Sequence, residues 1–307
     1  MSFSNIDPSR KLSRSSDTHD VINLDISSKC TLACPFCERQ SKEFNQKLFL
    51  DMSFDEFKFI ADHYDVFFCG QISDPIYNKD FKKMLEYLYK NNRNASIHTA
   101  AYRNNEDFYM DLFKAHPKAL WVFGIDGLPN KSAQHRINQK SEDLFKIMIK
   151  AKHLGMNVIW QMIVFDFNEK DIPVCEFTAK KLNIDLRLIH SNRFSDWRYK
   201  PSKDNYIEKT NLIGDELIPQ CLQGRELGHS AMGYVMPCCW MAEGDVETKY
   251  PNLCNDNTKI QNKNFSEINK AILDFKTMLK NNSKKAPLKC WEKCSNKSTS
   301  HKRYIDV

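Results

Sequence analysis

The sequence of 307 residues lacks any long apolar run. No run approaches the ~20 residues that a membrane-spanning helix requires, and residues 1–17 contain no hydrophobic stretch of the kind that a secretory signal requires. No motif that combines aromatic and basic residues for RNA recognition stands out. We therefore expect a cytoplasmic globular protein that does not bind membranes, and we do not expect nucleic acid to be its partner.

Cysteine, in contrast, is abundant, with eleven residues. Disulfides rarely persist in a reducing cytoplasm, so eleven cysteines, an odd number, indicate metal ligation or catalysis. The net charge of +6 is uneven, because residues 276–303 hold nine lysines and arginines and one acid, Glu292. This basic segment is able to bind an acidic partner such as nucleic acid, but we favour a solvated face beside negatively charged thiolates.

Apolar runs of strand length alternate with helical patterns. The runs are residues 21–26, 65–70, 95–100, 120–126, 157–165 and 185–190. The helical patterns are 53–64, 79–91, 105–115, 141–155 and 169–182, and the first opens with a Ser53-x-x-Glu56 capping box. This alternation predicts right-handed βαβ units and a parallel sheet. Six units are too few for a closed eight-stranded barrel, so we predict an α/β protein with a partial (β/α)6 TIM-like barrel.

The same pattern predicts three segments. Residues 1–18 are polar and rich in serine, which predicts a flexible arm. Residues 19–200 are predicted to form the partial barrel. After about Asp196 the alternation stops, and residues 201–300 are predicted to form a small second domain that carries six cysteines, at positions 221, 238, 239, 254, 290 and 294.

Three cysteines, Cys30, Cys34 and Cys37, follow the first predicted strand. The chemistry of parallel α/β proteins gathers at the carboxyl ends of the strands, so these thiols belong to the expected catalytic edge. Three thiolates from one loop can hold three irons of a cubane [4Fe-4S] cluster and leave the fourth iron open for a small molecule. A zinc site with a fourth ligand elsewhere is the alternative, although zinc knuckles usually come as paired C-x2-C units.

The C-x3-C-x-Phe36-C spacing resembles the defining motif of the radical S-adenosylmethionine (radical SAM) enzymes. This resemblance implies a [4Fe-4S] cluster that binds S-adenosylmethionine (SAM), with Phe36 in the cofactor site. After the second strand, Gly70, Ser73, Asp74 and Pro75 resemble a variant of the family's Gly-Gly-Glu-Pro motif. The resemblance implies that the backbone and the acidic side chain of this motif bind the amino group of SAM, whereas a simple polar turn is the alternative.

Two further strand ends extend the resemblance. Thr99 ends the third strand, where the family often places a hydroxyl or amide near the ribose, although an ordinary strand-end threonine is the alternative. The segment VFGIDGL followed by His135-Arg136 resembles the family's serine-isoleucine-aspartate-glycine segment and the motif after it. Arg136 would then pair with the SAM carboxylate, since a guanidinium suits bidentate binding; a surface ion pair is the alternative. Gly124 replaces the usual serine.

The later cysteines resemble an auxiliary-cluster domain of the SPASM or twitch type. Cys221, Gly233 and Cys238 have the spacing of its opening, with the glycine at a hairpin turn, and Cys290 and Cys294 have helical i, i+4 spacing. A full SPASM domain needs seven or eight cysteines for two clusters, so six favour a small α+β twitch-type domain. The resemblance implies one auxiliary [4Fe-4S] cluster on Cys221, Cys238, Cys290 and Cys294.

Four cysteines are left by these assignments. Cys239 and Cys254 are spares, and either is able to replace one of the four auxiliary ligands. Cys69 and Cys175 are expected to be core thiols.

The resemblance implies reductive cleavage of SAM to a 5′-deoxyadenosyl radical that abstracts hydrogen from a substrate, with an electron donor such as flavodoxin or ferredoxin. An auxiliary cluster suits oxidation, so we expect dehydrogenation of a small hydroxylated molecule, similar to that of the aminocyclitol dehydrogenases. Modification of a peptide or protein is the alternative, and a non-catalytic metal-binding protein is a remote one. No catalytic base is identified. Candidate substrate contacts near strand ends are His98, Trp160, Gln161, Asn168, His190, Asn192, Arg193 and Asp196.

Overall fold

The structure is a computed structural model of the chain. It describes residues 21–40, 51–190, 194, 199–207, 213–223, 227–242, 245–298 and 304–306. The predicted flexible arm, residues 1–18, lies outside the described residues. No helix in the described ranges is both long enough and apolar enough to cross a membrane.

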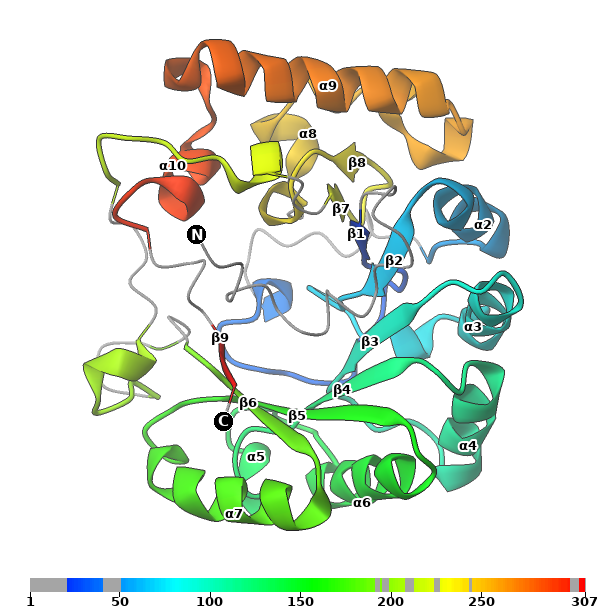
Figure 1. Ribbon diagram of the computed structural model, residues 1–307, viewed down its shortest axis with the longest axis vertical. Coiled ribbons are helices and arrows are strands. Elements are labelled where there is room, and N and C mark those ends of the chain that lie inside the picture. Colours follow the sequence, from blue (N-terminus) through cyan, green and yellow to red (C-terminus); the bar gives the residue numbers. More distant parts are fainter. Residues whose placement is uncertain are drawn as a thin grey trace.

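Six parallel strands form the centre of the fold, in the order in which the sequence predicts them (Figure 1). Each lies within its predicted range and starts at its predicted first residue. They are β1 (Val21–Leu24), β2 (Asp65–Phe68), β3 (Ala95–Thr99), β4 (Leu120–Gly124), β5 (Asn157–Ile163) and β6 (Asp185–Ile189). Because the helices return the chain to the same edge, all six carboxyl ends lie at one side of the sheet.

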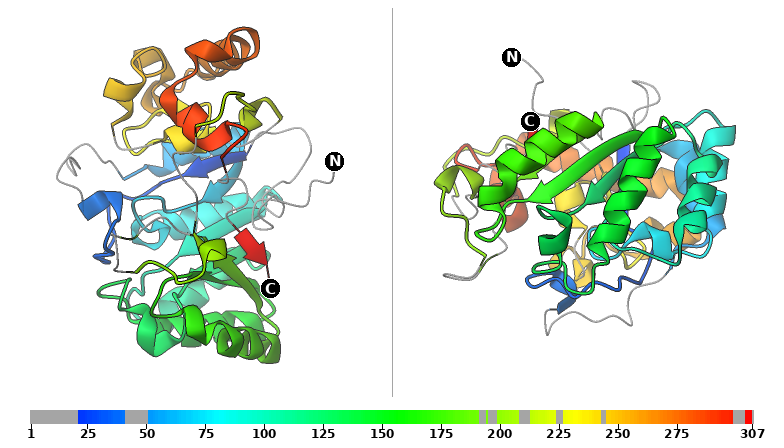
Figure 2. Two further views of the ribbon diagram at one scale, coloured as in Figure 1. Left: turned by 90° about the vertical axis from the view of Figure 1, so that its left-hand side faces the viewer. Right: turned by 90° about the horizontal axis from the view of Figure 1, so that it is seen from below.

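The helices cover the outer face of this curved sheet (Figures 1 and 2). They are α2 (Phe54–His63), α3 (Phe81–Lys90), α4 (Glu106–Ala115), the short α5 (Pro129–Ser132), α6 (Ser141–His153) and α7 (Ile172–Leu182). The predicted capping box is confirmed, since Ser53 and Glu56 each accept the other's backbone N–H at the start of α2. A short 3-10 turn, Glu169–Asp171, precedes α7, which therefore begins three residues later than predicted.

The sheet continues beyond the six predicted strands at both ends. Strand β7 (Leu227–His229) pairs parallel with β1, and β8 (Val235–Met236) pairs antiparallel with β7. Strand β9 (Tyr304–Asp306) pairs antiparallel with β6. Within the described residues the result is an open nine-stranded sheet whose outermost strands are β8 and β9. The prediction of a partial rather than closed barrel is thus confirmed.

Alternate residues of each strand point to different sides of the sheet. Apolar residues such as Ile22, Phe68 and Trp121 face the helices and are buried in the main core. The concave side carries more polar groups, including His98 and Gln161, and it leads to the carboxyl ends of the strands. The fold therefore separates a packed outer layer from a polar interior.

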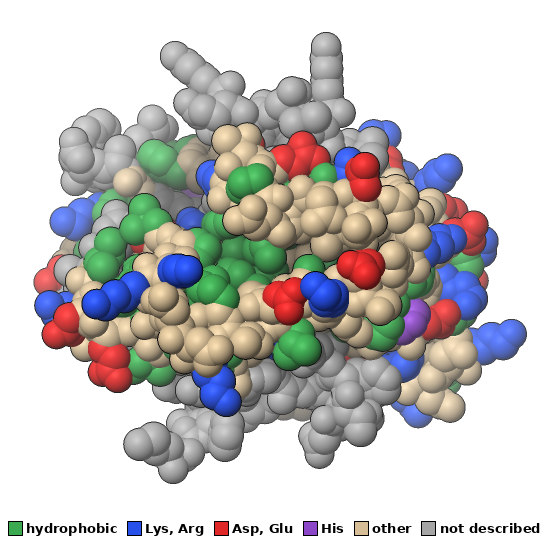
Figure 3. All heavy atoms as spheres, turned by 90° about the horizontal axis from the view of Figure 1, so that it is seen from above, with side chains coloured by type: hydrophobic (Ala, Val, Ile, Leu, Met, Phe, Trp, Pro, Cys, Tyr) green, Lys and Arg blue, Asp and Glu red, His purple; other side chains and the backbone are tan. Residues whose placement is uncertain are grey.

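The C-terminal part places three more helices beside the β7–β8 hairpin: α8 (Val246–Lys249), α9 (Phe265–Asn281) and α10 (Leu288–Cys294). Part of it joins the main core through Leu227, Ile260 and Ile268. The rest builds a smaller core around Cys221, which includes Tyr234, Met236, Met241, Val246, Tyr250, Phe275 and Leu279. Figure 3 shows the face that carries α9, where charges of both signs surround a hydrophobic hollow.

Candidate functional site

The three-cysteine loop, residues 30–37, lies on the segment that connects β1 to α2, and it lines a cavity of about 210 Å³ at the carboxyl edge of the sheet. Backbone hydrogen bonds fix it, among them Ala33 N–H to the Ile137 carbonyl at 3.0 Å and Cys37 N–H to the Cys34 carbonyl at 3.2 Å. Phe36 has a left-handed backbone, φ 61°, which turns the chain so that Cys37 returns toward Cys34. All three thiols are partly exposed, and all three line this cavity.

The thiols suit a metal cluster chemically. Burial, together with the nearby Asp74 carboxylate, raises the pKa of Cys30 to about 12. A thiol with such a pKa loses its proton when a cation binds it. Two cationic side chains, Arg39 and Arg136, line the same cavity and can balance the charge of a thiolate cluster. Three soft thiolates are the donors that iron–sulfur clusters use, so the loop fits a [4Fe-4S] cluster.

The Gly70 to Pro75 turn forms the adjoining wall. Gly70 has a φ of +54°, and a Cβ there would lie 2.9 Å from the Ser73 carbonyl oxygen, so only glycine fits without a shift. Asp25, at the end of β1, accepts hydrogen bonds from the Ile72 N–H, at 3.0 Å, and from the Ser73 hydroxyl. Burial raises the pKa of Asp25 to about 6. This carboxylate, which the motif comparison did not include, holds the turn against β1.

The Asp74 carboxylate is buried and bonded within the protein. Its oxygens accept the N–H groups of Ala100, at 2.8 Å, and Ala101, at 2.9 Å, and the Thr99 hydroxyl, at 3.0 and 3.1 Å. The Ile76 N–H lies 3.3 Å from Oδ1. These donors occupy the acceptor positions of one carboxylate. The direct contacts predicted for Asp74 with the SAM amino group, and for Thr99 near the ribose, stay predictions. The observed role of both side chains is to shape the chain after β3.

We expect Asp74→Asn to lower the free energy of unfolding by about 2 to 4 kcal/mol, because an amide NH2 replaces one acceptor oxygen and leaves buried N–H groups without a partner. Denaturant unfolding of the metal-free protein measures this change. The exposed Asp107 on α4 provides the control, since Asp107→Asn should change the value by less than about 0.5 kcal/mol. Equal stability of the two variants would contradict the role assigned to Asp74.

Arg136 approaches the cavity beside a buried carboxylate. Its Nη2 donates to Asp126 Oδ1 at 3.0 Å, and its Nε lies 2.9 Å from Oδ2 as an ion-pair contact rather than an aligned hydrogen bond. Despite burial, Arg136 and His135 hold the pKa of Asp126 below its usual range. A Cβ on Gly124 would lie 3.0 Å from Arg136 Nη2, so the glycine that replaces the family's serine makes room for the guanidinium.

The predicted substrate contacts separate into two groups. His98 and Gln161 line the cavity, and their contact with a substrate stays a prediction. Trp160 does not line it, because its side chain is buried in the main core and donates to the Ile125 carbonyl at 2.9 Å. Asn168 is also buried, and it bonds the backbone of Ile163 and Phe165. These two predictions are wrong. His190 is not among the cavity residues, and Asn192, Arg193 and Asp196 lie outside the described residues.

The two cysteines that we expected in the core also differ. Cys175 is fully buried in the main core, which confirms that prediction. Cys69 lines the cavity instead, and its thiol lies 3.4 Å from the Leu24 carbonyl.

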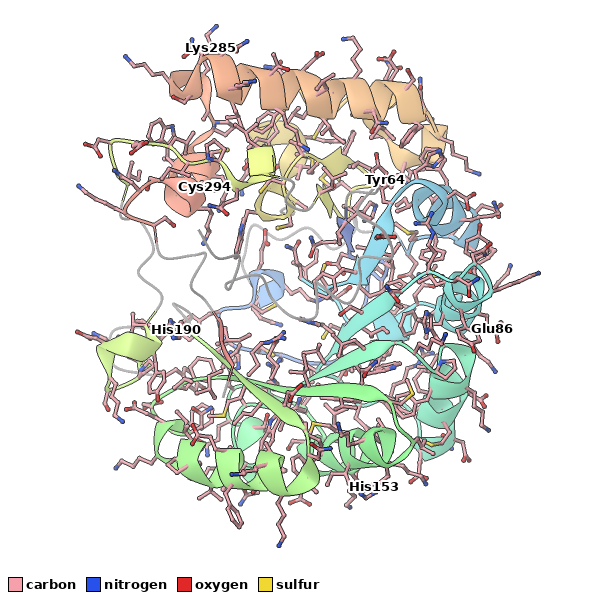
Figure 4. The ribbon with its side chains drawn as sticks, in the orientation of Figure 1. Tyr64, Glu86, His153, His190, Lys285 and Cys294 are labelled. Atoms are coloured by element: carbon pink, nitrogen blue, oxygen red, sulfur yellow. The ribbon has the colours of Figure 1, made fainter. Side chains whose placement is uncertain are left out.

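The later cysteines gather around a second cavity. The residues of its wall include Cys221, Cys238, Cys239, Cys290 and Cys294. The β7–β8 hairpin turns at Gly233, whose φ is +91°, and brings Cys238 back toward Cys221, as the spacing predicts. Figure 4 shows Cys294 at the end of α10. Burial and the neighbouring thiols raise the pKa of Cys221 to about 11 and that of Cys290 to about 12.

The two spare cysteines are now distinguished. Cys239 lines the second cavity and is hydrogen-bonded to Cys238, which raises the pKa of the Cys238 thiol. Cys254 does not line it, and its thiol faces Met236 and Val246. The cavity is only about 20 Å³, so a cluster there requires the thiol-bearing segments to move apart. No group of three or more potential ligands in the described ranges is arranged for a single metal ion.

A short 3-10 turn, Cys239–Met241, separates the two cavities. Cys239 and Trp240 line both of them, and the Gln71 side chain donates to the Cys239 carbonyl at 3.1 Å. Two lysines of the basic segment, Lys289 and Lys293, line the second cavity beside its thiols, and the solvated face expected for this segment stays a prediction. No motif identified Trp240 or Arg39, because their place depends on contacts between distant segments.

Comparisons with known proteins agree with this geometry. The family model "Radical SAM superfamily" matches residues 24–178. SuiB of Streptococcus suis, solved with bound S-adenosylmethionine, is similar over 72% of this chain with 12% identity and a TM-score of 0.53. This chain covers 60% of the SuiB structure. The structure of native anSMEcpe with bound AdoMet is similar over 81% of this chain and 79% of its own, with 15% identity and a TM-score of 0.55.

At these identities the structural similarity establishes a shared fold. A search of the curated proteins finds no significant match. The family match, in contrast, spans half of the sequence and includes the three-cysteine loop, the turn after β2 and the Arg136 segment. Members of this family use SAM and a [4Fe-4S] cluster. The chain therefore belongs to the radical SAM superfamily.

Proposed function

We propose that this protein is a radical SAM oxidoreductase that removes hydrogen from a small hydroxylated molecule. Cys30, Cys34 and Cys37 hold a [4Fe-4S] cluster, and a second cluster is held by four of the five cysteines around the second cavity. The chemistry that the first cluster supplies is reductive cleavage of SAM, which yields methionine and a 5′-deoxyadenosyl radical that abstracts hydrogen from the substrate.

The shared wall between the two cavities carries this proposal. Removing a hydrogen atom from a hydroxylated carbon leaves one electron and one proton to be removed before the oxidation is complete. Cys239 and Trp240 line both cavities, so the thiols of the second cavity lie next to the wall of the first. A second cluster on these thiols would accept that electron, which suits net oxidation of the substrate.

The polar interior supports a hydroxylated substrate. The Gln161 side chain lines the first cavity, and its Oε1 is buried without a hydrogen-bond partner among the described residues. A buried acceptor without a partner is destabilising, so the interior favours a ligand that donates hydrogen bonds. The carboxyl edge of the sheet, which holds the cluster loop, opens directly onto this interior.

Peptide modification is the second candidate. SuiB was also solved with its precursor peptide SuiA, and anSMEcpe with a Cp18Cys peptide. This chain covers 59% of the first of these structures and 88% of the second. A serine or cysteine side chain of a peptide would present the same kind of oxidisable carbon to the cavity.

Release of 5′-deoxyadenosine tests the proposed function. The protein is reconstituted with iron and sulfide under anaerobic conditions, reduced, and supplied with SAM. We expect 5′-deoxyadenosine and methionine in equal amounts, measured by liquid chromatography. A protein that contains the cluster and binds SAM but releases neither product would contradict the proposal.

A prediction for Arg136 tests the cofactor site. Arg136→Lys keeps a positive charge beside Asp126 but removes the planar fork that binds a carboxylate bidentately. We therefore expect the affinity for SAM to fall by on the order of tenfold, as measured by equilibrium dialysis of the reconstituted protein. Arg93 supplies a matched control, because it pairs with the buried Asp65 at the opposite edge of the sheet. If Arg93→Lys weakens SAM binding as much as Arg136→Lys does, Arg136 has no specific role.

A further inference from the structure

His135 presents a buried acceptor to the first cavity. The residue is 1% exposed and belongs to the cavity wall. Its Nδ1 lies 2.8 Å from Asp126 Oδ2, while its Nε2 is buried and has no hydrogen-bond partner among the described residues. A buried polar atom in this position costs free energy unless another molecule bonds to it.

The partner of His135 determines which ring nitrogen carries the proton in the neutral ring. Asp126 is paired with Arg136 and also accepts the Ile163 N–H at 2.9 Å, and its lowered pKa keeps it ionised. An ionised carboxylate only accepts hydrogen bonds, so Nδ1 of His135 carries the proton. In the neutral ring Nε2 is then an acceptor. The contact of Nδ1 with Asp126 also orients the ring, and the His135 backbone is held by a hydrogen bond from its N–H to the Ser132 carbonyl at 3.2 Å.

Two aromatic rings pack against the His135 ring. The His135 ring centroid lies 4.4 Å from that of Phe165 and 6.0 Å from that of Tyr199. Tyr199 also contacts Phe36 of the cysteine loop edge-to-face at 6.0 Å. These rings therefore pack the His135 side chain between the cluster loop and the end of β5, and only His135 of the group lines the cavity.

We propose that His135 binds the adenosyl half of SAM, an inference that rests on the function proposed above. Its Nε2 accepts a hydrogen bond from a donor of that half, either a ribose hydroxyl or the exocyclic amine of adenine. The neighbouring Arg136 lies beside Gly124 and lines the cavity together with Cys30 and Cys34 of the cluster loop. Arg136 thus contacts the amino-acid half of SAM, and the adjacent His135 contacts its adenosyl half.

Measuring the binding of two ligands tests the contacts to the two halves of SAM separately. The probes are SAM and 5′-deoxyadenosine, which lacks the amino-acid half, and their affinities for the reconstituted protein are measured by equilibrium dialysis. His135→Asn keeps an N–H toward Asp126 but removes Nε2. We expect it to weaken both ligands by about fivefold to tenfold. His135→Gln, which keeps an acceptor near the Nε2 position, should recover part of the loss, whereas Arg136→Lys should weaken SAM only.

His116→Asn is the matched control, because His116 is also buried but bonds the Arg93 carbonyl and does not line the cavity. This variant should bind both ligands as the parent does. If His135→Asn folds, holds its iron and binds both ligands with parental affinity, the inference is overturned. If the parent itself binds no SAM, the proposed function fails instead.

Ligand analogues test the same bond in the parent protein, so the test does not depend on the variants folding. The analogues are 5′-deoxyadenosine without its 2′-hydroxyl, without its 3′-hydroxyl, or with two methyl groups on the exocyclic nitrogen. We expect one of them to bind the parent about fivefold to tenfold more weakly than 5′-deoxyadenosine. His135→Asn should bind that same analogue with the same affinity as it binds 5′-deoxyadenosine. Equal binding of all four compounds to the parent would overturn the inference.

Discussion

Replacing Cys37 by alanine is expected to abolish release of 5′-deoxyadenosine. The loop after β1 supplies three thiols to one cavity, and a cluster that needs three ligands from this loop is lost when one is removed. The left-handed turn at Phe36 places Cys37 opposite Cys34, so no other residue of the loop can take its place. The measurement is 5′-deoxyadenosine formed per minute by the reduced, reconstituted protein.

Cys175→Ala is the control for this experiment. It removes a thiol of the same chain that is buried in the main core away from both cavities, so it should reduce packing slightly and leave 5′-deoxyadenosine release unchanged. The assignment of the first cluster is wrong if Cys37→Ala, with its iron at the first site lost, still forms 5′-deoxyadenosine at the parental rate.

Strand positions were predictable because local signals agreed with the fold. The six parallel strands lie in apolar runs that alternate with helical patterns, and the Ser53 and Glu56 capping box marks the first helix start. Strands β7, β8 and β9 were not predicted. They have three, two and three residues, too few to show an alternating pattern, and pairing with distant strands makes them extended.

Side-chain direction was less predictable than strand position. The run 157–165 is apolar on both sides, so the sequence could not show that Gln161 faces the cavity while Trp160 faces the helices. Asp74 gives a second example. The motif comparison assigns its acidic group to a ligand, and the hydrogen bonds that this group accepts from the N–H groups of Ala100 and Ala101 could not be read from the motif. Such contacts join residues that are far apart in the sequence.

The cysteine spacing predicted the grouping of the auxiliary thiols but not their relation to the first cavity. Gly233 and the helical spacing of Cys290 and Cys294 are local signals, and the structure shows the turn and the helix. The position of Cys239 between both cavities depends on β7 pairing with β1, a contact between segments about 200 residues apart. This pairing connects the two thiol groups through a single short turn.

Replacing Cys290 and Cys294 together by alanine is expected to lower the iron content of the reconstituted protein from ~8 to ~4 atoms per chain, because two thiols of the second cavity's set are lost. Cleavage of SAM should continue, since the loop at Cys30, Cys34 and Cys37 follows β1 and does not depend on α10. Iron analysis and 5′-deoxyadenosine release measure the two effects. The complementary change of Cys30, Cys34 and Cys37 should also leave ~4 iron atoms but end SAM cleavage.

Cys254→Ala provides the matched control within the same region. Its thiol faces Met236 and Val246 rather than the second cavity, so this variant should retain ~8 iron atoms. Cys239→Ala then decides whether Cys239 or Cys238 is the fourth ligand, because only the ligand's loss removes iron. Loss of a structural cluster also removes folding free energy, so circular dichroism must show that the barrel persists. If the parent never exceeds ~4 iron atoms, or if Cys254→Ala loses iron as the double variant does, the proposed second cluster on these cysteines is wrong.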